Sequence, residues 1–352
     1  FGAAEGELNY YVIAGPETSR VANTYARLTG FMPLPPKWAL GYHQSRVNYS
    51  SQQQLLNLAS EFRTRKIPCD ALYLDLYYKD RLNLFTWDPV TFPNPIKMNA
   101  SLEASGFKRV NIFDPFIIRR DPLWRFLDGS KYLLTDANTG NTLVTSIFLG
   151  TGGWIDFTKD ATRTWYAEAM KTFLSTGVSA VWDDLNEPAQ NDMPTAMYDF
   201  HGHPRIDLHA RNFYALAQTS LSYRVQKELR PAVRPWGLSR SGYAGIQRYA
   251  ANWSGDTLTT FDSLRVSIQI SASMGLSGQN FFGHDIGGFL GSPPPELFIR
   301  WLQFSSYTPL FRNHAVHWTA PREPWRFGEP YTSMIKKIIE QRYRLLPYTY
   351  TW

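Results

Sequence analysis

Cysteine is nearly absent from this chain of 352 residues, since Cys69 is the only one. A single thiol cannot form an internal disulfide, and it excludes a zinc site built on cysteine ligands. The chain also lacks a run of about 18 apolar residues, so we expect no membrane span. Its N-terminus lacks the charged and apolar regions of a signal peptide and looks cut from a longer protein, so the sequence leaves the compartment open.

Concentrated charge of one sign is missing as well. The 36 Lys and Arg residues exceed the 30 Asp and Glu residues, but the basic residues are scattered and the longest basic runs are pairs such as Arg119-Arg120. A nucleic-acid-binding surface normally gathers its charge into a stripe or cluster. We therefore expect no nucleic-acid partner and no membrane partner.

Aromatic residues and one acidic run stand out. The 12 Trp and 20 Tyr residues supply flat faces with polar edges, which suit sugar rings as well as protein cores. The run Val181-Trp182-Asp183-Asp184-Leu185-Asn186-Glu187-Pro188 follows a short apolar strand pattern. Burying carboxylates is costly unless they are paired or hydrogen-bonded. This cluster therefore indicates either metal binding or catalysis.

The alternation of strand and helix patterns predicts the fold. Helical patterns at residues 161–176 and 209–229 separate short apolar runs. Eight such runs predict an α/β protein with a (β/α)₈ TIM barrel and insertions after strands 3 and 4. A doubly wound open sheet is the alternative, but no G-x-G-x-x-G pattern follows an early strand. The predicted strands are residues 38–45, 70–75, 109–114, 179–184, 236–240, 249–256, 279–285 and 303–310.

Acidic residues recur at the predicted carboxyl ends of five strands: Asp75, Asp114, Asp184, Asp256 and Asp285. In a barrel these ends converge on one face, where active sites lie. A single Asp there is often a helix cap, whereas five indicate a site. Oxygen ligands would permit a divalent metal. Glycoside hydrolysis would instead need two carboxyl groups on opposite sides of an anomeric carbon, and Asp184 and Asp256 suit that pair.

The neighbours of these acids favour a sugar over a metal. Trp182 and Trp253 lie close to them in sequence, and indole planes are good floors for pyranose rings. Arg240 and Arg312 are expected to lower the pKa of neighbouring acids and to bind hydroxyl groups. His314 has no second histidine at ligand spacing.

Several motifs carry a family resemblance. Trp182-x-Asp184-Leu185-Asn186-Glu187 resembles the nucleophile signature W-x-D-M-N-E of glycoside hydrolase family 31. Ser239-Arg240-Ser241, with Asn252-Trp253-Ser254-Gly255-Asp256 after it, is similar to the acid/base segment of that family. Further matches are Leu74-Asp75, Gly283-His284-Asp285-Ile286-Gly287-Gly288-Phe289, Phe311-Arg312-Asn313-His314 and Glu323-Pro324-Trp325-Arg326-Phe327-Gly328.

The resemblance implies a retaining α-glycosidase that acts on an oligosaccharide or α-glucoside and needs no metal or organic cofactor. Asp184 would be the nucleophile and Asp256 the general acid/base. The resemblance leaves the oligomeric state open. The predicted substrate-binding residues are Asp75, Asp114, Trp182, Arg240, Trp253, Asp285, Phe289 and His314.

Three departures from the family pattern lie around the predicted sugar pocket. Asp75-Leu76-Tyr77 replaces D-x-D, Val47 replaces a common Trp after Arg46, and Phe148-Leu149-Gly150 replaces W-P-G. They leave the catalytic pair unchanged but leave the sugar open. The alternatives are an α-glucan transglycosylase, an α-xylosidase or an α-galactosidase of the same family. An inactive carbohydrate-binding relative is disfavoured because positions 184 and 256 are both Asp.

The resemblance also implies a domain division. Residues 1–35 would be the end of an N-terminal β-sandwich domain, with a strand at 8–13 and a connecting helix from Thr18 to Gly30. Residues 36–352 would be the catalytic barrel, truncated of C-terminal β domains. We expect the missing neighbours to leave apolar surface exposed.

Overall fold

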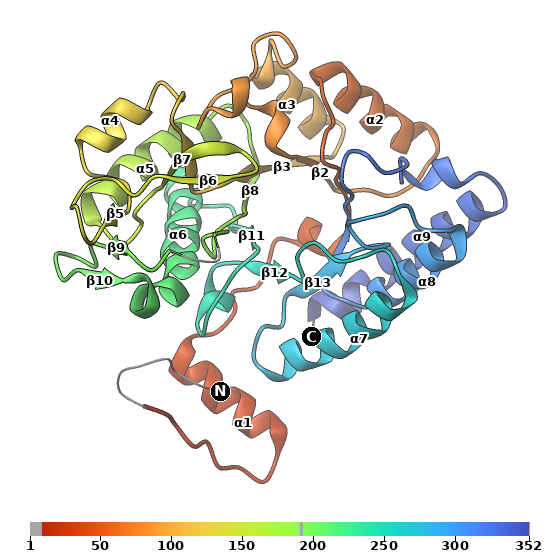
Figure 1. The fold of residues 1–352 in the computed structure, drawn as a ribbon. Coiled ribbons are helices and arrows are strands. Elements are labelled where there is room, and N and C mark those ends of the chain that lie inside the picture. Colours follow the sequence, from red (N-terminus) through yellow and green to blue (C-terminus); the bar gives the residue numbers. More distant parts are fainter. Residues whose placement is uncertain (1–8, 191–192, 352) are drawn as a thin grey trace.

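The computed structural model describes residues 9–190 and 193–351. At its centre, eight parallel strands form a closed barrel, and helices surround it (Figure 1). Each barrel strand pairs with the barrel strands that precede and follow it along the chain, and the last pairs with the first. The predicted barrel is confirmed. Its strands are β1 (Tyr42–Gln44), β2 (Ala71–Leu74), β3 (Lys108–Phe113), β8 (Ala180–Asp183), β11 (Gly237–Ser239), β12 (Ala251–Trp253), β13 (Phe282–Asp285) and β14 (Leu310–Asn313).

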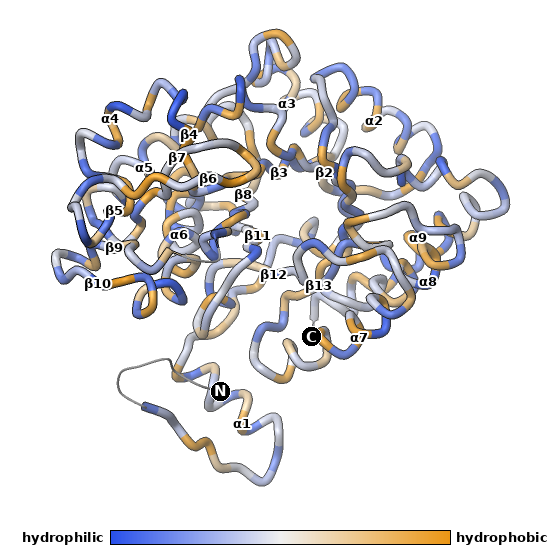
Figure 2. Tube along the Cα trace, viewed as in Figure 1, coloured by the Kyte–Doolittle hydropathy of each residue, from blue (hydrophilic) through white to orange (hydrophobic). Residues whose placement is uncertain are grey.

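The surrounding helices have hydrophilic and hydrophobic residues interspersed along them, as expected for helices with one face on the barrel (Figure 2). Helix α2 (Gln52–Thr64) shows how the sequence starts such a helix: Ser51 Oγ accepts a hydrogen bond from Gln54 N, and Gln54 Oε1 accepts one from Ser50 N. The other α-helices are α1 (Thr18–Thr29), α3 (Pro95–Ala104), α4 (Trp124–Gly129), α5 (Asp160–Leu174), α6 (Asp207–Leu229), α7 (Phe261–Leu276), α8 (Pro295–Ser305) and α9 (Tyr331–Thr351). Short 3₁₀ helices are η1 (Lys37–Leu40), η2 (Leu76–Tyr78), η3 (Asp80–Leu82), η4 (Ile246–Arg248) and η5 (Pro324–Phe327).

Two insertions follow β3 and β8, as predicted. The first contains β4 (Phe116–Ile118), α4, β5 (Thr135–Asp136), β6 (Thr145–Ile147) and β7 (Gly150–Trp154), and the second contains β9 (Ala196–Tyr198) and β10 (Arg205–Ile206). Strands β4, β7 and β6 form one small sheet. Strand β5 of the first insertion pairs with β9 of the second, so the two insertions are joined.

Some predicted boundaries are wrong. The strand predicted at 303–310 begins inside helix α8, and the eighth barrel strand is β14. Leu297, Trp301, Leu302 and Ser305 are buried at helical spacing, which explains this result. The first predicted strand, 38–45, is shortened by the 3₁₀ helix η1.

The predicted N-terminal elements also need correction. Of the strand predicted at 8–13, Leu8 lies outside the described residues, and residues 9–13 form no strand. No neighbouring strand in the described part of the chain pairs with them. The predicted helix is present as α1, which begins at Thr18 with Glu17 as its N-cap, and Gly30 ends it with a φ of 102°.

The barrel interior is filled by aromatic rings. The ring centroids of His43 and Trp236 lie 5.5 Å apart, and those of Tyr73 and Trp182 lie 6.0 Å apart. His43 and Tyr73 are also joined by a hydrogen bond of 3.0 Å. The interior is therefore a packed core, and a site can form only at the mouth.

Candidate active site

The predicted site residues follow the carboxyl ends of the barrel strands. Asp75, Asp114 and Asp184 come directly after β2, β3 and β8. Arg240 and His314 come directly after β11 and β14, Trp253 and Asp285 end β12 and β13, and Asp256 lies three residues beyond β12. Because these strands are parallel, all their carboxyl ends lie at one mouth of the barrel.

Asp184 lies beside a guanidinium group. Its Oδ1 is 3.3 Å from Arg240 Nε, and Arg240 also makes a bidentate pair with Glu187, at 2.8 and 2.9 Å. Burial raises the pKa of Asp184 to about 6, with Asp256 and Glu187 adding to the rise and Arg240 opposing it. Sequence analysis expected Arg240 to lower the pKa. Its effect has that sign, but burial outweighs it.

The loop that carries Asp184 is held to the next strand. Asn186 Nδ2 donates to Ser239 Oγ at 2.9 Å, and Asn186 Oδ1 accepts from Ser241 N at 3.0 Å. Leu185, between Asp184 and Asn186, has a φ of 56°, a left-handed conformation that a leucine rarely adopts. The amide of Asn186 therefore holds the Asp184 loop in a strained shape, as is common at active sites.

Asp256 lies on a more open loop that is tied to its neighbour. Its side chain is exposed, and partial burial raises its pKa, against the lowering effect of Arg240. The loop is held by hydrogen bonds from Phe289 N and Leu290 N to Thr257 O. At Gly288, with a φ of 78°, a side chain would lie 2.6 Å from Leu258 O, so this close approach requires glycine.

A buried histidine adds a second tie to the Asp256 loop. His284 Nδ1 contacts Ser254 Oγ at 2.8 Å, and His284 Nε2 contacts Ser271 Oγ on α7 at 2.8 Å. Burial lowers the pKa of His284 to about 4, so the ring is neutral near pH 7. His284 thereby connects Ser254, two residues before Asp256, to a helix. Sequence analysis quoted His284 in a motif but gave it no role.

The floor of the mouth combines indole rings with a buried ion pair. Arg312 Nη2 lies 2.7 Å from Asp285 Oδ1, and both side chains are fully buried. The Arg312 guanidinium lies 4.8 and 4.9 Å from the ring centres of Trp182 and Trp253. Burial raises the pKa of Asp285, and the guanidinium of Arg312 opposes this rise.

Several polar atoms of this floor are buried without a hydrogen-bond partner among the described residues. Native structures pair nearly all such atoms, with protein, water or ligand. Hydroxyl groups of a bound sugar would supply both donors and acceptors to them. The atoms are Trp182 Nε1, Trp253 Nε1, Arg312 Nε, Arg312 Nη1 and Asp285 Oδ2.

Asp75 and His314 face each other on the opposite side of the floor. His314 Nε2 is 3.6 Å from Asp75 Oδ2, and His314 Nδ1 is 2.7 Å from Ser45 Oγ. The His314 ring stacks on Phe289 at 5.0 Å and meets Trp182 edge-on at 5.2 Å. Burial raises the pKa of Asp75 to about 8 and lowers that of His314 well below 6.5. Both groups therefore favour their neutral forms.

Two acids are engaged elsewhere. Asp114, predicted to bind substrate, forms a buried ion pair with Lys79. Asp183 lies on the opposite face of β8 from Asp184, and its Oδ1 accepts a hydrogen bond from Ser222 Oγ on α6 at 2.9 Å. Burial raises the pKa of Asp183 to about 7.

In the described part of the chain, no three His, Cys, Asp or Glu side chains lie so that they could hold a metal ion. None of its helices is long and apolar enough to cross a membrane.

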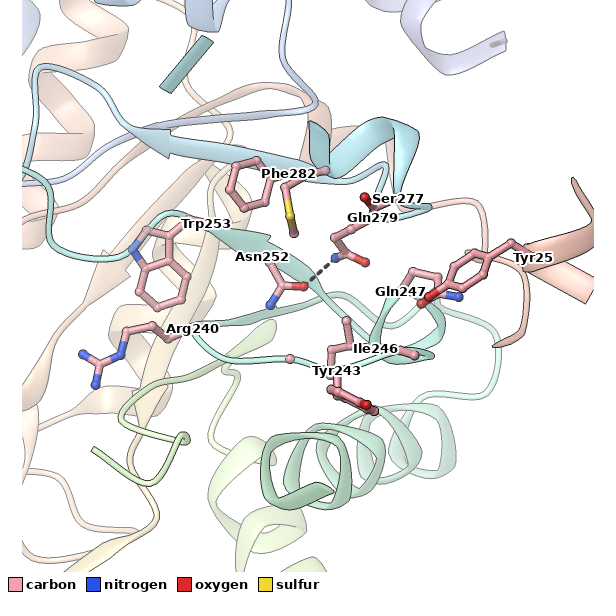
Figure 3. A pocket seen from close by; sticks show the side chains of 13 residues that line it. Tyr25, Arg240, Tyr243, Ile246, Gln247, Asn252, Trp253, Ser277, Gln279 and Phe282 are labelled. Carbon is pink, nitrogen blue, oxygen red and sulfur yellow. Dashed lines mark hydrogen bonds between the residues drawn. The ribbon is translucent and has the colours of Figure 1, made fainter. Parts of the chain in front are cut away.

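A cavity of about 230 Å³ lies behind two of the site residues. Arg240 and Trp253 line one end, and Tyr25 of α1 lies at the other (Figure 3). Between them, Asn252 Oδ1 accepts a hydrogen bond from Gln279 Nε2 at 2.6 Å. Asp184 and Asp256 do not line this cavity, although Arg240 and Trp253 at the mouth do.

With this geometry in view, the comparison with known families is decisive. A family model described as the glycosyl hydrolases family 31 TIM-barrel domain matches residues 32–352. The chain belongs to glycosyl hydrolase family 31. The family predicted from the motifs is confirmed.

Curated relatives match nearly the whole chain. It is 38% identical to Alpha-glucosidase 2 of Bacillus thermoamyloliquefaciens, a match that covers all of this chain and 45% of the relative. It is 36% identical to Glucosidase 2 subunit alpha of Schizosaccharomyces pombe, with 98% and 38% covered. The chain thus spans less than half the length of these relatives.

Solved family 31 structures share the fold. A glucosidase II alpha subunit has a TM-score of 0.90 at 32% identity, over 96% of this chain and 37% of that one. A Flavobacterium johnsoniae dextranase complexed with glucose has a TM-score of 0.91 at 32% identity, over 96% and 43%. An alpha-xylosidase from a soil metagenome has a TM-score of 0.90 at 26% identity, over 96% and 53%.

Proposed function

We propose that the protein is a retaining α-glucosidase that releases terminal α-linked glucose from oligosaccharides through a covalent glycosyl-aspartate. The observation that carries this proposal is the position of Asp184 beside Arg240, at a mouth whose floor holds buried polar atoms without partners. The names of the relatives support glucose as the sugar.

The first step forms the covalent intermediate. Asp184 attacks the anomeric carbon, and the bond from that carbon to the glycosidic oxygen breaks. Asp256 gives its proton to the departing oxygen, so the leaving sugar departs as a neutral alcohol. Arg240 stays beside Asp184 and keeps its carboxylate ionised for the attack.

The second step releases the sugar. Asp256, now ionised, takes a proton from a water molecule, and the resulting hydroxide attacks the anomeric carbon. The bond to Asp184 breaks and its carboxylate is restored, while Asp256 is again protonated. Two displacements at one carbon retain the α configuration.

The two carboxyl groups must differ in protonation for this sequence. Burial raises the pKa of Asp184 to about 6, so its carboxyl group is ionised at pH 7. Asp256 is the more exposed of the two, and the pKa of its carboxyl group is already raised. A substrate that covers Asp256 removes water from it and raises its pKa further, because desolvation disfavours the charged form.

Sugar binding is assigned to the floor and to the Asp75–His314 pair. Trp182 and Trp253 offer indole N–H donors, and Arg312 offers two free donor nitrogens beside Asp285. Leu76 N already donates to Asp75 Oδ1 and Ser45 Oγ already contacts His314 Nδ1, so Asp75 Oδ2 and His314 Nε2 are the atoms that meet the hydroxyl groups of an uncharged sugar.

Trapping of the intermediate tests the proposal. The protein would be incubated with a 5-fluoro-α-glucosyl fluoride, which forms the glycosyl-enzyme and releases it slowly, and digested for mass spectrometry. We expect a glucosyl adduct on Asp184, kept in an Asp183→Asn variant and lost in Asp184→Asn. An adduct on any other residue would contradict the assignment, and labelling by the xylosyl analogue alone would replace glucose by xylose.

A further inference from the structure

Three exposed aromatic side chains gather at the rim of the catalytic mouth. Tyr77 is 44% exposed, Trp318 is 69% exposed, and His317 between them is also exposed. The ring centroids of Tyr77 and His317 lie 6.2 Å apart, and those of His317 and Trp318 lie 4.6 Å apart, both edge to face. We call these three residues the rim platform.

The rim platform adjoins the sugar-binding pair. Tyr77 is two residues beyond Asp75, and His317 is three residues beyond His314. Asp75 and His314 face each other at 3.6 Å. The segment after Asp75 leads to Tyr77, and the segment after His314 leads to His317 and Trp318. Strands β2 and β14 both flank β1 in the barrel, which places the two loops at neighbouring positions of the mouth.

The backbone on both sides is fixed although the rings are exposed. Tyr77 lies in η2, between buried Leu76 and Tyr78, and the side chain of Asp75 accepts a hydrogen bond from Leu76 N at the start of this turn. On the other side, Arg46 Nη2 donates to the carbonyl oxygens of His317, at 2.9 Å, and Thr319, at 2.5 Å.

Fixed, exposed aromatic faces next to a sugar pocket suit another sugar ring. Tyr and Trp rings offer an apolar face for the C–H groups of a pyranose, at a small cost in side-chain entropy because each side chain has only two rotatable bonds.

We propose that Tyr77, His317 and Trp318 form a binding platform for a saccharide unit of the substrate outside the catalytic pocket. This inference rests on the proposed glucosidase function and adds to it a preference for leaving groups that are themselves sugars. Val47 N donates to Ala315 O at 2.8 Å, two residues before His317, and the Val47 side chain packs with Val316 and Phe289. Two of the three departures from the family pattern, Tyr77 and Val47, thus lie near this rim.

The test compares a saccharide leaving group with one too small to reach the platform. Maltose, nigerose and isomaltose would be assayed, and the disaccharide cleaved fastest would be compared with α-glucosyl fluoride. In Tyr77→Ala and in Trp318→Ala, we expect kcat/KM for the disaccharide to fall about tenfold through a higher KM, with the fluoride unchanged. Tyr307→Ala is the matched control, because Tyr307 is 67% exposed on the loop before β14, at the opposite end of the barrel.

The outcomes separate the two proposals. If both substrates lose activity equally, if neither does, or if the disaccharide loses kcat rather than affinity, the platform is refuted. If the wild-type protein does not cleave α-glucosyl fluoride, the glucosidase function itself fails. A fall in melting temperature without a change in KM would mean that these side chains contribute to the stability of the fold and not to sugar binding, and it would also refute the inference.

Discussion

Removal of the Glu187 charge should shift the pH dependence of the reaction. Glu187 and Asp184 both lie against Arg240 Nε, at 2.8 and 3.3 Å, so their contacting oxygens are at most 6.1 Å apart, the sum of the two distances. Glu187 raises the pKa of Asp184, which must be ionised to attack. A Glu187→Gln substitution therefore lowers that pKa, and the acidic limb of the rate profile moves to lower pH.

The size of the shift follows from Coulomb's law. At 6.1 Å and an effective dielectric constant of about 20, two unit charges interact by roughly 2.7 kcal/mol. Glu187 is 37% exposed, so water screens the interaction, and an effective constant of about 40–80 reduces it to roughly 0.7–1.4 kcal/mol. Because one pH unit corresponds to about 1.4 kcal/mol, the limb should move from about pH 6 by roughly 0.5–1 unit.

The assay is the pH profile of kcat/KM for α-glucosyl fluoride, which reports the free enzyme. The control is Glu103→Gln, which removes the same charge from a half-exposed side chain that pairs with Lys108. Lys108 is the first residue of β3 and so lies at the other end of the barrel, and this variant should leave the acidic limb in place. An unchanged limb in Glu187→Gln, or one displaced to higher pH, would refute the reasoning. A higher KM alone would mean that Glu187 acts only by orienting Arg240.

Two further predictions concern His284 and Asp183. His284→Ala should reduce kcat/KM for disaccharides at least tenfold more than for α-glucosyl fluoride, because kcat/KM reports the first step, in which fluoride leaves without a proton from Asp256; equal losses of kcat/KM would disprove this positioning role. Asp183 has a folded-state pKa raised by burial to about 7, so its contribution to stability is present below about pH 4 and lost as pH rises through 7. Asp183→Asn should therefore stabilise the protein at pH 8 by on the order of 2 kcal/mol, and by less at pH 5, in urea unfolding; destabilisation at pH 8 would be contrary evidence.

The strand ends could be predicted from sequence because short-range patterns determine them. In the run Trp182-Asp183-Asp184, side chains alternate between two faces of β8. The structure directs Asp183 to Ser222 of α6 and Asp184 to Arg240 at the mouth. The strand phase therefore separates two adjacent acids that composition alone treats as equal.

The eighth strand was missed because its polar residues are explained only by distant partners. Strand β14 carries buried Arg312 and Asn313, which count against a strand in any local reading. Arg312 pairs with Asp285, 27 residues away, and Asn313 donates to Tyr42 Oη, 271 residues away. The end of the preceding helix α8 is more apolar, and the strand was therefore predicted too early in the sequence, from within that helix.

Pairings across the mouth were beyond the sequence for the same reason. Glu187 meets Arg240 over a separation of 53 residues, and Lys79 meets Asp114 over 35. The family motif includes Glu187 but does not identify Arg240 as its partner, and no local sequence pattern indicates a role for Lys79. The sequence therefore predicts that Asp114 binds substrate but does not indicate its ion pair with Lys79.

The charges at the mouth also limit the kind of sugar that can bind. Five acidic side chains lie there, and the two guanidinium groups that contact them already pair with carboxyl groups. A phosphorylated or carboxylated sugar would bring a further negative charge beside the ionised carboxylate of Asp184, so repulsion would weaken its binding. Burial raises the pKa of most of these acids, because their ionised forms lose solvation there. An uncharged sugar reduces that loss through its hydroxyl groups, so the mouth is built for a neutral ring. The groups counted are Asp75, Asp184, Glu187, Asp256 and Asp285 against Arg240 and Arg312.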